Sequence, residues 1–453
     1  MKMDEQYSKY FHFLRFALGI ENEAPTDMDW QGLYAFARSQ TLLGVVFDGI
    51  ARLPKELVPA SGLLTIWIGC SMKIMQRNQL MYKLSAEVYS EIRKMGFRCC
   101  VLKGQGNAMA YPNRYSRTSG DVDVWVMTNS RDELRQIAKG LADSPSDIER
   151  EIVNHIELNR RGVTVELHPT PMIFNNPILN HRMQKWFTRN ADLQWSNIVN
   201  LPDGVGQIAI PTATFNAIYQ LSHLYHHFFY EGVGLRQIID YYYVLMGLQQ
   251  MAQTDTNPLL NRESDGCLEK NSKNSREANS LFAKGSDDGS VSAVCEQAHT
   301  ANTDSSSMPL HGICMPLGQK QAASQQKQSL ADGNTKHKTQ NVTQSTQNTL
   351  RHLGLYGFAG ATMYVLHEVL GLSEDKMIVT MDVKRGKLLL DEILSGGNFG
   401  QYGNHSFESG TLGHNLQRLK RDVKLVRYYP LEALAEPFFR VWHFFWRVFH
   451  KAN

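Results

Sequence analysis

Hydrophobic and polar residues alternate with a period that changes along the chain, and each period predicts a different kind of element. From residue 1 to about residue 95, apolar residues recur every three or four positions, as at Leu80, Leu84 and Val88, which indicates amphipathic helices. Farther along, the period shortens to two and β-branched residues become frequent, which predicts strands. The predicted strands are residues 99–102, 122–126 and 163–167. The chain therefore begins with a helical region and continues with an α/β region.

A second helical region follows and is interrupted by a long polar segment. Leu221, Leu224 and Phe228 share one helical face, and a helical pattern resumes at Leu353. The segment between them, residues 253–347, is rich in Ser, Asn, Gln, Thr, Asp and Lys and has almost no aromatic residues. Such a composition cannot bury enough apolar area to offset the entropy of ordering the backbone. We expect a disordered insertion between two helices of one bundle, and a fold that survives its deletion.

The predicted fold class is α/β, of the α+β kind, with a small mixed sheet flanked by helices and joined to a mostly helical region. The predicted regions are an N-terminal helical region over residues 1–95, an α/β core over 96–210, a C-terminal helical region over 211–252 and 348–453, and the insertion over 253–347.

The C-terminal sequence PFFRVWHFFWRVFHKAN is strongly aromatic and has Arg440, Arg447 and Lys451 interspersed. An amphipathic helix in weak contact with a membrane surface has this composition. A C-terminal helix docked on the bundle has it as well. The sequence leaves both interpretations open.

Composition excludes several classes of protein. Of the 453 residues, 42% are apolar, which is ordinary for a globular protein. The chain is long enough for two or three domains. The formal charge of +3 is too small to indicate a general attraction to nucleic acid, so an anionic ligand must be held locally. We find neither a secretion signal nor an uncharged apolar stretch of about 18 residues. Six cysteines without CxxC pairs fit a reducing compartment, and we expect a cytoplasmic protein.

The clearest chemical signal lies in the sequence SGDVDVWV. Side chains alternate along a strand, so Asp121 and Asp123 share one face while Val122, Val124 and Val126 share the other. The two aspartate Cα atoms would lie about 6.6 Å apart at ~3.3 Å per residue. Two carboxylates so close repel unless a cation lies between them, and Mg²⁺ prefers oxygen ligands. The alternative is an edge strand that shows two polar residues to water.

Two neighbouring segments strengthen the interpretation as a metal and nucleotide site. Lys103, Gly104 and Gln105 follow an apolar run, where a glycine turn lets the backbone approach a phosphate and a lysine adds positive charge. Glu166 is a carboxylate on an otherwise apolar strand and is suited to bind metal or to accept a proton. His168 at the end of that strand is more simply a packing or hydrogen-bonding residue.

Arginines and histidines add weaker candidates. Arg114 and Arg117 precede the two aspartates and are suited either to phosphate oxygens or to a solvated loop. His223 and His227 lie four residues apart on a helix, but the HExxH glutamate is absent, so histidines at a domain interface are the simpler interpretation. The sequence GLRQIID places an arginine and an aspartate four residues apart, where they can pair on the helix surface.

Taken in order, these parts resemble the nucleotidyltransferase superfamily that includes polymerase beta. An apolar strand, a glycine turn and a helix precede a hydrophobic-D-hydrophobic-D-hydrophobic strand and then a hydrophobic-E-hydrophobic strand. More narrowly, LKG, YP, Arg117 ahead of GDVDVWV, VELH and the helix IYQLSHLYHHFFYEGVGLRQIID look like the uncharacterised bacterial nucleotidyltransferase family NTP_transf_5. The resemblance covers about residues 40–250.

The resemblance implies Mg²⁺-dependent transfer of a nucleoside monophosphate from an NTP, expected to be ATP, to an unidentified acceptor, with pyrophosphate leaving. By position, Asp121 and Asp123 match the two metal-binding catalytic aspartates and Glu166 matches the third carboxylate. Gly104 matches the glycine that contacts the triphosphate. Two features depart from the superfamily: Gln105 stands where Ser is usual, and the gap to the aspartates is longer than the common spacing.

A second function of another class stays open at this point. The chain would keep the fold and bind a nucleotide without catalysis, as a regulatory module associated with a membrane surface in an envelope polysaccharide system. Binding of ATP without release of pyrophosphate would distinguish this module from the enzyme.

Overall fold

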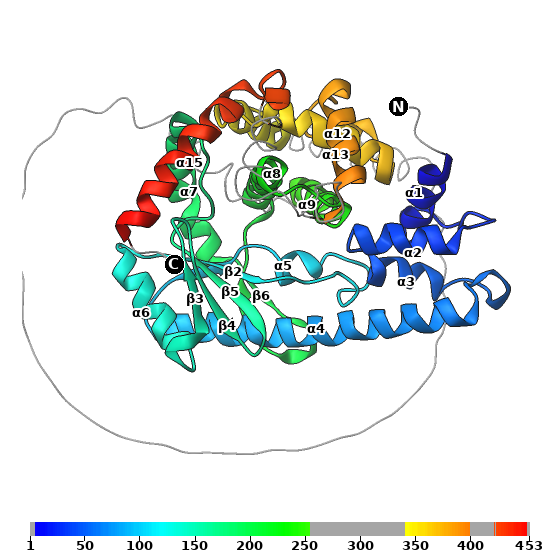
Figure 1. Ribbon diagram of the computed structural model, residues 1–453, viewed down its shortest axis with the longest axis horizontal. Coiled ribbons are helices and arrows are strands. Elements are labelled where there is room, and N and C mark those ends of the chain that lie inside the picture. Colours follow the sequence, from blue (N-terminus) through cyan, green and yellow to red (C-terminus); the bar gives the residue numbers. More distant parts are fainter. Residues whose placement is uncertain (1–4, 254–339, 399–420, 422, 451–453) are drawn as a thin grey trace, which may run out of the picture. The chain divides into compact units, whose positions relative to one another are not determined.

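The structure is a computed structural model that describes residues 5–253, 340–398, 421 and 423–450. All of these residues belong to one compact unit formed by residues 1–259 and 337–453 (Figure 1). The predicted N-terminal, α/β and C-terminal regions therefore pack into a single unit.

The unit contains a mixed sheet of five short strands in the order β1-β2-β5-β4-β3. The strands are β1 (Cys99–Val101), β2 (Val122–Val126), β3 (Ile148–Glu151), β4 (Ile156–Arg160) and β5 (Val163–His168). Strands β2 and β5 are parallel, and every other neighbouring pair is antiparallel. A separate two-stranded sheet consists of β6 (Ile198–Asn200) and β7 (Gln207–Ala209). Strands β1, β2 and β5 were predicted, whereas β3, β4, β6 and β7 were not.

Strand β2 lies inside the sheet, between β1 and β5. Val122, Val124 and Val126 are buried as expected, and Trp125 on the opposite face stacks on Phe215. The alternative of a solvated edge strand is therefore wrong, because apolar side chains cover both faces of β2.

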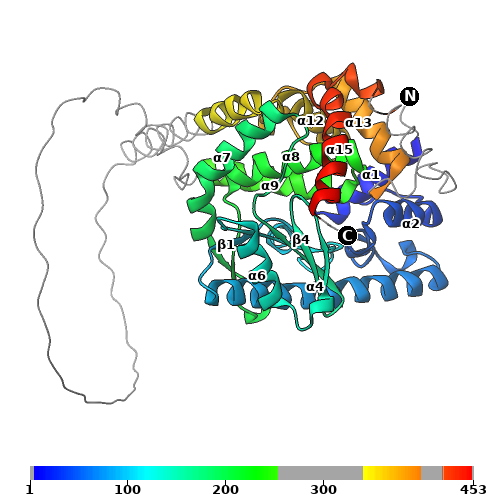
Figure 2. The same ribbon diagram turned by 60° about the vertical axis from the view of Figure 1, so that its left-hand side comes forward.

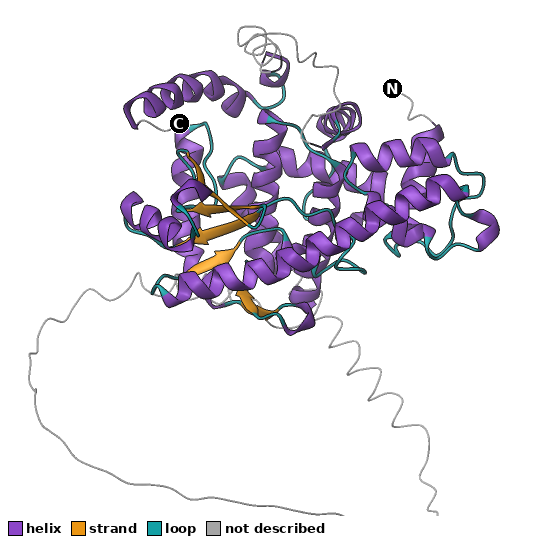
Figure 3. Ribbon diagram, turned by 60° about the horizontal axis from the view of Figure 1, so that its bottom comes forward, coloured by secondary structure: helices purple, strands orange, loops and turns teal. Residues whose placement is uncertain are grey.

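Helices cover the two faces of the sheet. The N-terminal helices are α1 (Glu5–Ala17), α2 (Trp30–Ser39), α3 (Leu43–Ile50) and α4 (Ser61–Lys94), and those around the sheet are α5 (Gln105–Ala108), α6 (Arg131–Leu141), α7 (Pro177–Ser196), α8 (Ala213–Tyr230) and α9 (Leu235–Gln253). Helix α4 lies across the strands on one side (Figure 3), and α8 and α9 lie on the other side (Figures 1 and 2). Short 3-10 turns are η1 (Lys55–Leu57), η2 (Pro145–Asp147), η3 (Pro202–Gly204) and η4 (Glu374–Lys376).

The sequence explains where several of these helices begin. The side chain of Ser130 accepts a hydrogen bond from the backbone of Glu133 at the start of α6, and Asn176 caps α7 in the same way ahead of a proline. In the second half of α4, buried residues such as Leu84, Val88 and Ile92 recur at spacing four and pack under the sheet.

The C-terminal part adds a helix over residues 340–352, α12 (Tyr356–Leu370), α13 (Val383–Gly396) and α15 (Pro430–His450). The first of these corrects the predicted insertion, because residues 340–347 are helical. Val342, Thr346 and Leu350 recur at spacing four and are buried, so this stretch has an apolar face despite its polar composition. Most of the predicted insertion lies outside the described residues.

The predicted fold class is confirmed: helices surround a small mixed sheet. Among the described residues, no helix is both long and apolar enough to cross a bilayer.

Candidate active site

Three carboxylates meet where the start of β2 lies beside the second half of β5. The parallel pairing places Asp123 opposite Glu166 in register, and Asp121 lies two residues upstream of Asp123. An oxygen from each of the three carboxylates lies within 4.8 Å of the other two. Asp123 is buried, while the other two are partly exposed. The structure therefore brings together the three acidic residues that the sequence singled out.

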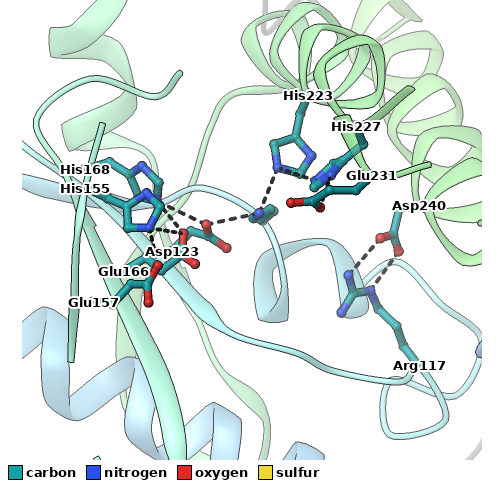
Figure 4. A network of polar contacts seen from close by, with 11 residues as sticks. Arg117, Asp123, His155, Glu157, Glu166, His168, His223, His227, Glu231 and Asp240 are labelled. Atoms are coloured by element: carbon teal, nitrogen blue, oxygen red, sulfur yellow. Dashed lines mark hydrogen bonds and ion pairs between the residues drawn. The ribbon is translucent and has the colours of Figure 1, made fainter. Parts of the chain in front are cut away.

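Two basic side chains contact this cluster of Asp121, Asp123 and Glu166, which we call the carboxylate cluster. The Lys103 Nζ atom lies 3.1 Å from Asp123 Oδ1. The His168 Nε2 atom lies 3.2 Å from the same oxygen and 3.1 Å from Glu166 Oε2 (Figure 4). His168 is thus a hydrogen-bonding residue of the site and bridges two of the carboxylates.

Burial and charge set the protonation of these groups. Burial alone would lower the pKa of His168, but its hydrogen bonds to Asp123 and Glu166 raise the pKa to about 9. Burial alone would raise the pKa of Glu166, but the hydrogen bond and charge of His168 lower it to about 2. Burial opposes the charge of Lys103, yet the carboxylates of Asp123 and Asp121 raise its pKa. Glu166 is therefore ionised at neutral pH, which suits a metal ligand better than a proton acceptor.

The glycine turn forms as predicted, and the Gln105 side chain lies in the interior. Gly104 has φ +64° and ψ −111°, a conformation that residues with a Cβ atom rarely adopt. The Gln105 side chain is buried, donates to Asn78 Oδ1 at 3.1 Å and accepts from Ser119 Oγ at 3.1 Å. The side-chain amide is therefore used in a buried network that supports the turn, and a nucleotide contact of residue 105 stays a prediction for its backbone.

The predicted arginines differ in their placement. Arg114 is exposed, whereas Arg117 is buried and forms a bidentate ion pair with Asp240 of α9. The Nε–Oδ1 and Nη2–Oδ2 distances are both 2.8 Å, and the Tyr111 hydroxyl donates to Asp240 Oδ1 at 2.7 Å. Asp240 therefore does not form the predicted surface pair with Arg236, because the loop before β2 brings a better-placed guanidinium into the interior.

Helix α8 contributes a chain of polar contacts that the sequence did not predict. The Lys103 Nζ atom lies 2.8 Å from His223 Nε2, and His227 Nε2 lies 3.2 Å from that same atom. The His227 Nδ1 atom lies 2.9 Å from Glu231 Oε2. Burial and the Lys103 charge hold the pKa of His223 well below its usual value. These histidines belong to the site, and the helical spacing of four from His223 through His227 to Glu231 was the available signal.

His155 was also missed. Its Nε2 atom lies 2.9 Å from Glu157 Oε1 and 3.8 Å from Glu166 Oε2 (Figure 4). Burial and the neighbouring His168 lower its pKa. His155 directly precedes β4, a strand that the sequence analysis did not predict, so no local pattern pointed to it.

A cavity of about 210 Å³ lies between the sheet and helices α8 and α9. Its lining includes five carboxylate residues, Asp121, Asp123, Glu166, Glu231 and Asp240, and three Lys or Arg residues, Lys103, Arg117 and Arg236. His168, whose pKa is raised to about 9, adds a fourth cation, so the five carboxylates still leave the cavity with an excess of negative charge, which suits a divalent cation. At its other end, the Arg117 Nη1 atom is buried and has no hydrogen-bond partner among the described residues. Such a donor is suited to an anionic ligand.

The carboxylate cluster fits a divalent metal ion. Its donor atoms are all oxygens, the type that Mg²⁺ prefers. The Asp123 Oδ2 atom is buried and, within the described part of the chain, has no hydrogen-bond partner, although a buried polar atom normally has one. Glu166 also forms a second close group with His155 and His168.

Comparison with known proteins gives one finding. A family model described as an uncharacterised nucleotidyltransferase, NTP_transf_5, matches residues 26–267, which is more than half of the chain. The match includes the carboxylate cluster, the glycine turn and helices α8 and α9. No curated protein and no solved structure matches the chain.

Proposed function

The chain belongs to the uncharacterised nucleotidyltransferase family NTP_transf_5, and on this premise we propose that it transfers a nucleoside monophosphate from an NTP, with ATP as the expected donor, to an acceptor, releasing pyrophosphate in a Mg²⁺-dependent reaction. The observation that carries the proposal is the approach of three carboxylates to within 4.8 Å, with a buried Asp123 oxygen that has no partner among the described residues.

Asp121, Asp123 and Glu166 would hold the metal. When bound, Mg²⁺ supplies positive charge that stabilises the phosphate oxygens on which negative charge develops during transfer. Glu166 is kept ionised by His168, so it offers a charged oxygen across the whole neutral range. His168 also fixes the orientation of Asp123 and Glu166 through its two hydrogen bonds.

The basic end of the cavity would bind the triphosphate. Lys103, Arg117 and Arg236 line the cavity. Within the described residues, the hydrogen bond of Arg236 is a long one, 3.4 Å from its Nη1 atom to the Thr118 carbonyl. Asp240 holds the Arg117 guanidinium in place through two hydrogen bonds. A guanidinium fixed in this way recognises phosphate oxygens without first losing side-chain entropy.

Release of pyrophosphate tests the proposal. Purified protein with Mg²⁺, labelled NTPs and cell extract should release pyrophosphate and give an acceptor whose mass increases by one nucleotide. The double variant Asp121→Asn and Asp123→Asn should lower the rate roughly 100- to 1000-fold, the scale seen when a charge-stabilising group is removed. The exposed Asp132→Asn serves as a matched control and should leave the rate unchanged. Equal rates for the double variant and the wild type would contradict the proposal.

One observation favours the alternative, a module that binds a nucleotide without transfer. Lys103 and His168 already contact Asp123, so two protein cations partly neutralise the carboxylate cluster. Calorimetric binding of ATP with no pyrophosphate release across a panel of acceptors would support this alternative over the enzyme.

A further inference from the structure

Helix α15 turns its apolar face away from the protein. The large apolar side chains along it are 50–78% exposed: Leu431, Leu434, Phe438, Val441, Trp442 and Phe445. Their spacing of three and four residues puts them on one stripe of the helix. A single exposed apolar residue is ordinary, whereas a continuous stripe marks an interaction surface. We call these six residues the α15 stripe.

Polar contacts on the opposite face fix the rotation of the helix. The buried Glu432 carboxylate accepts a hydrogen bond from the Asn175 backbone at 2.8 Å, ahead of α7. One turn later, Glu436 is buried and forms an ion pair with Arg440. Rolling the α15 stripe inward would expose Ala433, which is 1% exposed, and would break the Glu432 contacts. The stripe therefore faces outward as a consequence of built contacts.

We propose that the α15 stripe docks on the surface of a lipid bilayer that contains anionic lipids. Phe and Trp side chains, which form much of the stripe, are typical of helices that lie in the interfacial region of a bilayer. The charge of the same segment is complementary to anionic headgroups. Residues 441–453 include Arg447 and Lys451 and no acidic residue, whereas the Arg440 charge is already paired with the Glu436 carboxylate.

Shape, more than size, favours a bilayer over a second copy of the chain. A stable protein–protein interface buries about 800 Å² on each partner and requires close shape complementarity. The six side chains offer an area of the same order, about 700 Å² if a large side chain offers about 200 Å², but on a narrow convex ridge of one helix. A fluid bilayer requires no complementary shape. The helix would lie on the bilayer, in keeping with the finding that no described helix is able to span one.

Vesicle flotation with the full-length protein tests the proposal. The probes are vesicles of phosphatidylcholine alone and of phosphatidylcholine mixed with phosphatidylglycerol. The test variant combines Phe438→Asp with Trp442→Asp. The matched control combines Ile66→Asp with Met72→Asp, which adds the same charge at two exposed apolar residues of α4. Circular dichroism of both variants checks that the fold is retained.

The wild type should float with the mixed vesicles and several-fold less with phosphatidylcholine alone. The α15 variant should lose binding about tenfold or more, and the α4 control should float as the wild type does. Equal flotation of the α15 variant and the wild type would overturn the proposal. Failure of the wild type to float with either kind of vesicle would also overturn it. If, in addition, the wild type sediments as a dimer and the α15 variant as a monomer, the stripe is a contact between two copies of the chain.

Discussion

Replacing Asp240 with asparagine should destabilise the protein strongly, because it leaves the Arg117 charge buried without a counterion. The two side chains are only 4% and 6% exposed, and Asp240 accepts three hydrogen bonds, two from Arg117 and one from Tyr111. Removing one partner of a buried ion pair typically costs about 3–5 kcal/mol. Asparagine keeps one acceptor oxygen, so we expect a loss near the lower end, about 3 kcal/mol.

Urea unfolding followed by circular dichroism measures this loss in the full-length chain. The control is Asp132→Asn, which removes a carboxylate of an ion pair with Arg135 whose side chains are 80% and 40% exposed. An exposed pair contributes about 0.2–1 kcal/mol, so the control should change the free energy of unfolding by less than 1 kcal/mol. If Asp240→Asn also changed it by less than 1 kcal/mol, the Arg117–Asp240 pair would not be the buried contact described above.

Three further predictions follow from other parts of the molecule. Burial raises the pKa of Glu432 from 4.5 to about 7, so its contribution to stability is present below pH 4.5 and is lost as the pH rises to about 7. Between pH 4.5 and 7, the free energy of unfolding of the Glu432→Gln variant should fall less than that of the wild type, by on the order of 3 kcal/mol at 1.36 kcal/mol per pKa unit. Identical pH profiles of the variant and the wild type would refute the raised pKa of Glu432. Arg236→Gln should weaken ATP binding about tenfold in calorimetry while the exposed Lys139→Gln leaves it unchanged, and equal affinities would remove Arg236 from the phosphate end. Deleting residues 260–336, which lie within the polar segment predicted as an insertion, should leave the midpoint of thermal unfolding within about 2 °C, and a larger fall would show that they support the fold.

The sequence predicted the carboxylate cluster well because local rules determine it. Because side chains alternate between the two faces of a strand, Asp121 and Asp123 lie on one face of β2. For the same reason, Glu166 lies on the face of β5 opposite to Val165 and Leu167. Alternation does not say that β2 pairs with β5 in register. That neighbourhood followed from the resemblance to the nucleotidyltransferase family, which the family match confirms.

The residues that were misplaced depend on long-range packing. Asp240 pairs with Arg117, which is 123 residues away, and not with its helical neighbour Arg236. Lys103 meets His223 across 120 residues. Periodicity within one element contains no information about either contact. The buried partner of the Gln105 side chain, Asn78, likewise comes from a distant element, α4.

The central claim is that the carboxylate cluster binds divalent cations, and calorimetric titration of Mg²⁺ into the full-length protein with a non-hydrolysable ATP analogue tests it most directly. The wild type and Asp132→Asn should bind Mg²⁺ with the same affinity and stoichiometry. The double variant Asp121→Asn and Asp123→Asn should show no binding heat while remaining folded. Undiminished Mg²⁺ binding by that double variant would contradict the account.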